Sequence, residues 1–409
     1  MKRLGSTGLL TCVLLFATLE AQTFTQRGFL DTTLTLYPQT APNDSGHAIA
    51  ASLLRYEPTW TPKPWLKLSA SFDARADTHD QVERTLHLNW QDRSLERPAL
   101  SIRRLSAILK RDRFTAEIGK QFVRWGKADI LNPTDRFAPK DFLSVVDTEV
   151  LAITAARLTY SSGSNSFDAV WQPRFTPSRT PLLNQRWTVL PPILDEFQLH
   201  DLGAVFPGRS SFGARWNHTG AGYEYSLSYF DGFNHLPLFL GSLAPNGIDF
   251  RRTYPSLRLY GGDVAIPRRW FTVKTEAAWF TSPKNQEDEY VLYVVQLERQ
   301  IHELTLVGGY AGEVVTSHAN GIQFSPERGF ARAFLGRAMY QIDPNRSLIV
   351  DFDIRQNGRG SFVRVEYSQA LGQHWRATTG FAWLRGDPSD FLGQYHRNSH
   401  GIIGLKYSF

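Results

Sequence analysis

The sequence has one cysteine, only a small excess of positive charge and, beyond residue 20, no long run of apolar residues. A single cysteine excludes a scaffold held together by disulfides. The missing apolar runs exclude a polytopic helical membrane protein, because each helical span needs about 20 such residues. A net charge of +6 over 409 residues gives no reason to expect a nucleic acid partner.

Aromatic residues, in contrast, are plentiful: 27 Phe, 15 Tyr and 11 Trp make up 13% of the chain. Together with many β-branched residues, they exclude a largely disordered protein. The length allows either two or three soluble domains or one large barrel. The aromatic content favours the barrel.

The first residues are typical of a secretory signal peptide. Lys2 and Arg3 form a positive start, residues 9–17 form a short apolar segment, and Ala21 is a suitable last residue before cleavage. The segment is too short and too one-sided for a transmembrane helix. We therefore expect residues 1–21 to be a signal peptide and residues 22–409 to be one exported domain.

The dominant pattern along the chain has a period of two. In residues 65–77, leucine, alanine and phenylalanine alternate strictly with charged residues and serine. A transmembrane β-strand needs about 9–11 residues, with lipid on one side and a polar lumen on the other, whereas soluble strands average about five or six. The pattern recurs in 223–230, 270–280, 347–355, 363–368 and 375–383. Its length and repetition favour membrane-spanning strands.

The connections between these segments alternate between short and long, which predicts an all-β, antiparallel, up-and-down transmembrane barrel with both termini in the periplasm. The expected strands are 24–37, 47–60, 65–77, 100–111, 114–123, 150–160, 166–173, 210–218, 222–230, 256–264, 270–280, 289–299, 303–311, 331–341, 346–355, 361–369, 374–385 and 399–409. This gives about 18 strands. Sixteen is the alternative, because 47–60, 100–111 and 256–264 have the weakest patterns.

The last residues, GLKYSF, place Leu405, Tyr407 and Phe409 on one face of the final strand. They resemble the C-terminal signal of Gram-negative outer-membrane proteins, which the barrel-assembly machinery recognises. With about 18 strands, the chain is similar to substrate-specific porins and alginate-export-type channels. The resemblance implies a passive channel in the bacterial outer membrane for small hydrophilic, anionic or sugar-like solutes. It also implies contact with lipid and lipopolysaccharide, and trimers are common among porins.

In porins the loop after the fifth strand commonly folds inward and sets the constriction, so the resemblance assigns this role to residues 124–149. Mixed charges there would produce a transverse field that selects solutes by charge. The candidate constriction residues are Arg124, Lys127, Asp129, Asp135, Arg136, Lys140 and Asp141. The alternative is a solvated surface loop with local ion pairs.

Charged residues at inward strand positions are candidates for lining the lumen, since Arg or Lys facing lipid at the midplane would cost about 2–4 kcal/mol. They are Arg75, Glu117, Arg157, Arg215, Glu224, Arg258, Lys274, Glu276, Asp351, Asp353, Arg364, Glu366 and Arg376. They either form a selective conduit or pair across neighbouring strands. The apolar, proline-rich loop 174–209 could plug the pore, bind a ligand or contact another subunit.

An enzyme, a metal site and a cofactor are not expected. His318 and His400 lack a catalytic partner at a recognisable spacing, and no HExxH or nucleotide-binding motif is present. The main rival to a channel is a plugged barrel that binds or assembles a surface polysaccharide such as a capsule. The two differ in whether the lumen is open.

Overall fold

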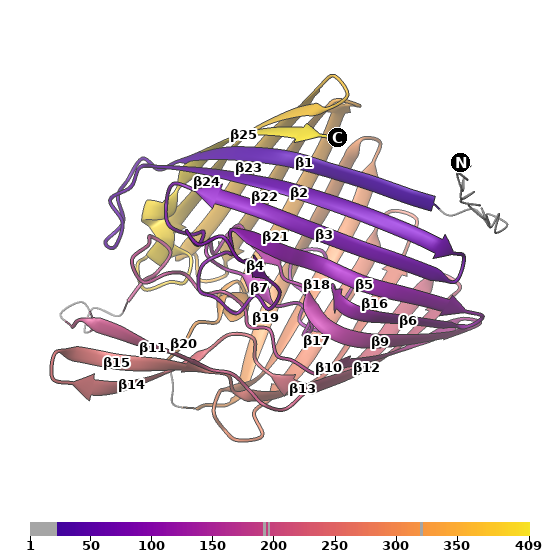
Figure 1. The fold of residues 1–409 in the computed structure, drawn as a ribbon, viewed down its shortest axis with the longest axis horizontal. Helices are drawn as coiled ribbons and strands as arrows, with labels where there is room; N and C mark the ends of the chain where they lie inside the picture. The colour runs from indigo at the N-terminus through magenta and orange to yellow at the C-terminus, as the bar shows by residue number, and fades with distance from the viewer. Residues whose placement is uncertain (1–22, 191–193, 195–196, 320–321) are drawn as a thin grey trace, which may run out of the picture.

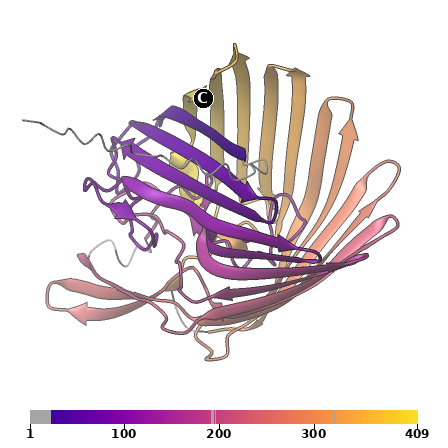
Figure 2. The same cartoon turned by 45° about the vertical axis from the view of Figure 1, so that its right-hand side comes forward.

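The computed structural model describes residues 23–190, 194, 197–319 and 322–409. The predicted signal peptide, residues 1–21, lies outside the described residues. In the described part, eighteen long antiparallel strands form one sheet that closes into a barrel (Figures 1 and 2). The first and last strands pair with each other, from Phe29 opposite Ser408 to Leu36 opposite Gly401.

All eighteen predicted strands are confirmed, and the alternative of sixteen is wrong. The barrel strands are β1 (Thr23–Leu36), β2 (Ala48–Lys63), β3 (Leu66–Asp77), β5 (Leu100–Arg111), β6 (Phe114–Gln121), β9 (Ile153–Ser162), β10 (Asn165–Gln172), β12 (Ser211–Gly220), β13 (Tyr223–Phe233), β16 (Ser256–Pro267), β17 (Thr272–Thr281), β18 (Glu289–Ile301), β19 (Leu304–Ser317), β21 (Ala333–Asp343), β22 (Arg346–Arg355), β23 (Gly360–Leu371), β24 (Trp375–Gly386) and β25 (His400–Ser408). Alternation over this length determines the strands because lipid and lumen demand opposite chemistry from successive residues.

The two faces of the wall differ as the alternation predicts. In β3, Phe72 is 37% exposed on the outside, whereas its neighbour Asp73 is 3% exposed on the inside. On β24, Trp375, Phe381 and Trp383 are also exposed on the outer face. In the described residues, no helix is both long and apolar enough to cross a membrane.

The closing seam of the barrel depends on the C-terminal residue. The backbone of Phe409 exchanges two hydrogen bonds of 2.9 Å with Gly28 on β1. A Cβ at Gly28 would lie 2.5 Å from the Phe409 ring, so only glycine leaves room for the ring. Tyr407 packs on Trp375 with ring centroids 4.9 Å apart. The last residues thus join β1, β24 and β25.

The two ends of the barrel are unequal. Eight short turns of two to four residues join the strands at the end that also holds the start of β1 and the C-terminus of the described chain. We call this the short-turn end; in outer-membrane barrels it faces the periplasm. The connections at the other end are mostly longer and carry β4 (Leu88–Asn89), β7 (Lys140–Asp141), β8 (Glu149–Val150), β11 (Leu199–Val205), β14 (Leu238–Ala244), β15 (Gly247–Thr253), β20 (Ile322–Gln323), α1 (Pro326–Gly329) and η2 (Gly393–Asn398).

Four of these small strands, in the order β11-β15-β14-β20, form a second sheet that projects from the barrel mouth (Figure 1). The hairpin β14–β15 lies in a segment that the sequence pattern assigns to loop. The Asn246–Gly247 pair was the available signal; in the structure Pro245 and Asn246 form the turn, and Gly247 begins β15 opposite Ala244. We call this sheet the mouth sheet.

The main apolar core lies inside the barrel. Trp125 and Phe137 of the third long loop (residues 122–152) pack against Phe230, Leu259 and Phe280 of the wall. The same cluster includes inward residues of β9, β10, β18, β19 and β21. Trp125 and Phe137 meet edge to face at 5.2 Å, and Phe137 and Phe230 at 5.1 Å. The third loop is therefore fixed to one half of the wall by buried apolar surface.

Candidate functional site

The third loop turns into the barrel at Gly126 and is held by a single wall carboxylate. Glu276 on β17 accepts hydrogen bonds from the backbone N–H groups of Lys127 (3.0 Å), Ala128 (3.2 Å) and Thr134 (2.8 Å). Gly126 has φ +91°, and a Cβ there would lie 2.6 Å from the Glu276 carboxylate. This close approach requires glycine. The backbone therefore turns sharply at Gly126.

Beyond this anchor the loop descends toward the short-turn end. Lys127 Nζ contacts Glu224 at 2.5 Å, and Asp129 accepts a 2.8 Å contact from Lys274 Nζ. Glu224 is the second residue of β13 and Lys274 the third of β17, each close to a short turn. The loop thus extends through most of the length of the barrel.

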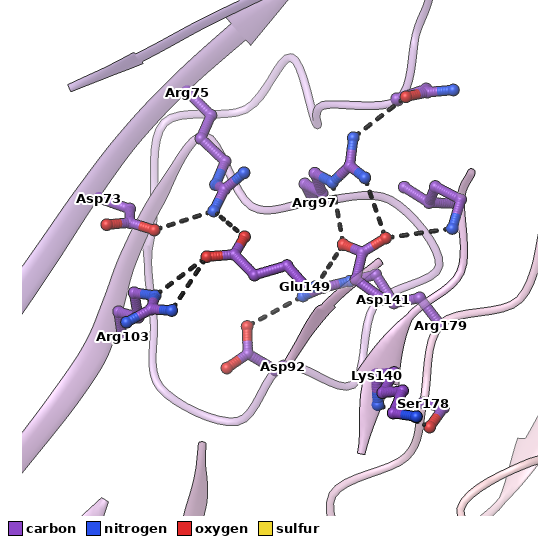
Figure 3. Close-up of polar contacts among 12 residues, drawn as sticks. Asp73, Arg75, Asp92, Arg97, Arg103, Lys140, Asp141, Glu149, Ser178 and Arg179 are labelled. Atoms are coloured by element: carbon purple, nitrogen blue, oxygen red, sulfur yellow. Dashed lines mark hydrogen bonds and ion pairs between the residues drawn. The ribbon is translucent and has the colours of Figure 1, made fainter. Parts of the chain in front are cut away.

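The far end of the same loop contacts the opposite wall, where Glu149 receives three arginines, two of which, Arg75 and Arg103, are drawn in Figure 3. Its carboxylate accepts hydrogen bonds from Arg55 on β2 (2.8 Å), Arg75 on β3 (2.6 Å) and Arg103 on β5 (3.1 Å). Burial alone would raise the pKa of Glu149, but Arg75, Arg55 and Arg103 outweigh it and lower the pKa to about 2. Glu149 therefore stays ionised at neutral pH.

A bulge in β5 makes this arrangement available. The register between β3 and β5 shifts so that Arg103 is the extra residue, and both Arg103 and Arg104 reach partners in the lumen. Arg104 contacts Glu117 on β6 at 2.8 Å. Bulges commonly redirect a side chain in this way. Without it, regular alternation would send one of the two arginines to the lipid face.

The fourth long loop (residues 173–210) joins the cluster through Arg179, whose side chain is 4% exposed. Arg179 donates to Asp141 (3.1 Å) in the third loop and to Asp92 (2.9 Å) in the second long loop, residues 78–99 (Figure 3). Arg97 binds Asp141 with two hydrogen bonds, of 2.9 and 3.0 Å. Burial opposes ionisation of Asp141, but Arg97 and Arg179 more than offset it and hold its pKa well below the usual range.

These contacts form one network, which we call the arginine cluster. Its cations are Arg55, Arg75, Arg97, Arg103, Arg179 and Lys120, and its carboxylates are Asp73, Asp92, Asp141 and Glu149. Six positive groups face four negative ones, so the cluster carries a net charge of +2. Arginines that share carboxylates in this way hold the loops rigidly and still present a positive surface.

The middle of the third loop is tied to α1. Glu327 contacts Arg136 and, at 2.8 Å, Lys140. Burial would raise the pKa of Glu327, but these two cations lower it to about 2. Arg136 also lies over the Phe280 ring, 5.2 Å from its centroid. The loop is therefore held by charge as well as by its apolar face.

All seven predicted constriction residues are brought into the barrel, and each has an ion-pair partner. Arg124 and Asp135 pair within the loop at 2.5 Å, and the other five pair with the wall or with other loops. Arg124 and Asp129 are the more accessible, with side chains 53% and 36% exposed. Local ion pairing, the alternative interpretation, is thus present. The selective role stays a prediction.

Most of the predicted lumen residues lie on the inner face and pair there, across strands or with the third loop. The wall pairs are Arg157–Asp168 (2.6 Å), Arg215–Asp263 (2.7 Å), Glu117–Arg104 (2.8 Å) and Arg364–Asp351 (2.8 Å), and Arg376 donates to Ser368 at 2.9 Å. Glu366 shares the inward face with Arg364, and Asp353 is buried there. Their positions follow the alternation, and their roles stay predictions.

Arg258 is a correction: it lies on the outer face. Its neighbours Leu257 and Leu259 are buried inward, whereas Arg258 shares the outer side with Tyr260, which is 47% exposed. Arg258 contacts Asp231 at 3.0 Å, near the ends of β16 and β13 at the mouth. Arginine on the lipid face is costly at the midplane but costs only about 0–1 kcal/mol near the interface. Charge alone therefore does not identify inward residues at a strand end.

The sequence analysis missed the centre of the arginine cluster. Arg55 and Arg103 lie on predicted strands, and their charge on an inward or bulged position was the available signal. Arg97 and Arg179 lie in long loops, where no periodicity marks them. These arginines meet their carboxylate partners only through tertiary contacts, in which the two residues are 38 to 94 positions apart in the sequence.

The fourth loop also fills part of the mouth. Arg186 is 2% exposed, lies 3.6 Å above the Tyr37 ring and donates to Asp44 at 3.2 Å. These contacts hold the fourth loop against the connection between β1 and β2 at the mouth. Its role as a plug, a ligand site or a subunit contact stays a prediction. Across the part of the chain that the structure describes, no group of three or more His, Cys, Asp or Glu side chains is placed to hold a metal ion.

No protein-family model and no curated protein matches this sequence. Solved structures do. A BenF-like porin from Pseudomonas fluorescens Pf-5 is 8% identical, with TM-score 0.57, covering 96% of this chain and 99% of that chain. OpdK from Pseudomonas aeruginosa with vanillate is 9% identical (TM-score 0.55; 96% and 99%), and OccAB4 from Acinetobacter baumannii is 10% identical (TM-score 0.54; 95% and 99%). The chain therefore has the fold of a porin-type outer-membrane barrel with eighteen strands.

Proposed function

We propose that the protein is a non-enzymatic outer-membrane channel that lets small hydrophilic solutes, preferably anionic ones, diffuse through a lumen narrowed by its third and fourth loops. The observation that carries the proposal is the course of the third loop, which contacts β13 and β17 at one end and β2, β3 and β5 at the other. A loop that crosses the lumen in this way is suited to set a constriction.

The apolar core indicates which half of the lumen would carry solute. It joins the third loop to the inner face of β9 to β21, which closes that half. The remaining wall has only a smaller apolar cluster, which includes Phe362 and Leu384. Its inner face also carries Arg376, Lys406, Glu366 and Asp31, which are exposed or half-buried. We propose that the aqueous path follows β22 to β25 and β1 to β3.

The charge along this path supports a preference for anions. The arginine cluster carries a net +2 where the third loop meets β2, β3 and β5, and Arg364 and Arg376 continue the positive groups along β23 and β24. Guanidinium groups bind carboxylates with two hydrogen bonds, which a sugar acid or a small organic acid would provide. One of the similar structures, OpdK from Pseudomonas aeruginosa, contains vanillate, an aromatic carboxylate, which accords with this class.

The direct test is single-channel conductance of the purified protein in a planar bilayer under a salt gradient. Discrete steps with a reversal potential favouring anions are expected. Exchanging Arg124 for glutamine should shift the reversal potential toward cations, because its side chain is 53% exposed on the third loop. Arg258→Gln is the matched control, since it removes the same charge from the outer face. A shift in the control alone would contradict the assignment.

The second candidate is a plugged barrel that binds or assembles a surface polysaccharide. The observation that favours it is the depth of burial of the loop charges: Asp141, Arg179 and Arg186 are each 5% exposed or less. Correctly folded, inserted protein that gives a silent bilayer would favour this candidate over the channel. In either case we propose export by the N-terminal signal and recognition of Tyr407 and Phe409 by the barrel-assembly machinery. Formation of a homotrimer is a further proposal, tested by cross-linking in native membranes.

A further inference from the structure

A large apolar cavity lies at the mouth, separate from the arginine cluster. Its volume is about 900 Å³, near the upper end of the range for small-molecule sites. It opens between the fourth loop and the mouth sheet. Apolar side chains line most of it, among them Leu182, Trp187, Leu199, Phe250, Phe324 and Tyr395.

The floor of this cavity is held in place by buried hydrogen bonds. Gln185 donates to the carbonyl of His79 at 2.7 Å and accepts from Gln81 at 2.9 Å. Trp187 is 1% exposed and packs on Tyr395 of η2, with ring centroids 5.4 Å apart. The fourth loop is thus fixed to the second loop and to η2, so the floor is preformed.

The opposite wall is the mouth sheet. β15 pairs in parallel with β11 and antiparallel with β14, which places Leu199 next to Ile248 and Gly241 next to Phe250. The fixed fourth loop and the mouth sheet thus border one apolar cavity. Its lining fits a ligand with an apolar body.

The charged groups at this cavity are predominantly acidic. Asp80, Glu96, Asp201 and Arg252 reach it, and Arg252 is already paired with Asp201 at 3.2 Å. Asp80 is paired with Arg84 at 2.5 Å. Within the described residues, Glu96 has neither a hydrogen bond nor an ion pair. Burial, followed by repulsion from Glu83 and Asp80, raises the pKa of Glu96, and the attraction of Arg84 offsets only part of this rise.

We propose that this mouth cavity binds an organic cation with an apolar body, such as an aryl- or alkylammonium compound, with the ammonium group at Glu96. The aromatic lining adds to the fit, because ammonium groups are attracted to the faces of Trp, Tyr and Phe. The site does not depend on conduction, so it would be present in an open or a plugged barrel.

The test uses three probes of the same shape: 4-phenylbutylammonium, 4-phenylbutanol and 4-phenylbutyrate. Binding is measured by calorimetry on the protein in lipid nanodiscs, with empty nanodiscs subtracted. We expect the ammonium compound to bind at least about tenfold more tightly than the carboxylate, with the alcohol between them. Equal or tighter binding of the carboxylate would overturn the proposal, as would no binding of the ammonium compound.

Two variants locate the binding. Glu96→Gln should weaken the ammonium compound about tenfold and leave the alcohol unchanged, because only the charge contact is lost. Gly241→Trp should abolish binding of all three probes by filling the cavity; a Cβ at Gly241 lies 3.6 Å from Ile248, so the backbone accepts a side chain there. Leu240→Trp, on the opposite face of β14 and 53% exposed, is the matched control. Heat-modified gel mobility checks that the Gly241→Trp barrel is folded. If it is folded and still binds the probes as the wild type does, the probes bind elsewhere.

Discussion

Replacing Glu149 by glutamine should release the far end of the third loop. Three arginines lose their shared acceptor: Arg55 and Arg75 keep only Asp73, and Arg103 loses its carboxylate partner. The carboxyl group has a pKa of about 2 in the folded protein against an ordinary 4.5. At about 1.4 kcal/mol per pKa unit, the ionised form contributes about 3 kcal/mol to holding the loop at neutral pH. Loss of that energy corresponds to an increase in loop opening of about a hundredfold.

Hydrogen exchange of residues 141–150 in nanodiscs measures this opening directly. Since the folded pKa is lowered, the stabilisation is complete above about pH 4.5 and is lost as the pH falls toward 2. The hydrogen-exchange rate of residues 141–150 in the wild-type protein should therefore approach that of the Glu149→Gln variant only in acid. Glu57→Gln is the matched control, because it removes a lumen carboxylate paired only with Arg27, whose side chain is 81% exposed. Wild-type protection of residues 141–150 in Glu149→Gln at pH 7 would refute the reasoning.

Three further predictions follow from other parts of the barrel. Arg376→Gln should lower anion selectivity in bilayer recordings, because Arg376 is an exposed cation on the proposed path; an unchanged reversal potential would place the path elsewhere. Gly28→Val should slow closure of the barrel, because a Cβ at this position would collide with the Phe409 ring. The delay would be seen during refolding as later appearance of the heat-modifiable gel band, and folding at the wild-type rate would contradict the role of the seam. Burial raises the pKa of Glu287 to about 7, against the hydrogen bonds that Asn234 and Gln323 donate to it. The folded region around Glu287 should therefore lose about 3 kcal/mol as the pH rises from about 4.5 to about 7, because the buried carboxyl group ionises; exchange of residues 234–238, corrected for intrinsic rates, should show this, and Glu287→Gln should abolish it.

The strands were predictable because each residue of a membrane wall meets one of only two environments. Lipid accepts apolar side chains and water in the lumen accepts polar ones, so a strand such as β3 shows its whole length as alternation. The same reasoning located the turns and the final strand. It failed for Arg258, since near the membrane interface both faces tolerate a cation.

What only the tertiary structure decided is the content of the lumen. The third loop was recognisable as long and charged, yet its depth depends on Glu276, which lies 142 residues beyond Thr134. The convergence of Arg55, Arg75 and Arg103 on Glu149 depends equally on strand order and on one bulge in β5. Alternation describes each residue relative to its own strand. The distances between loops and the opposite wall are set by closure of the barrel, which brings together residues that local sequence does not relate.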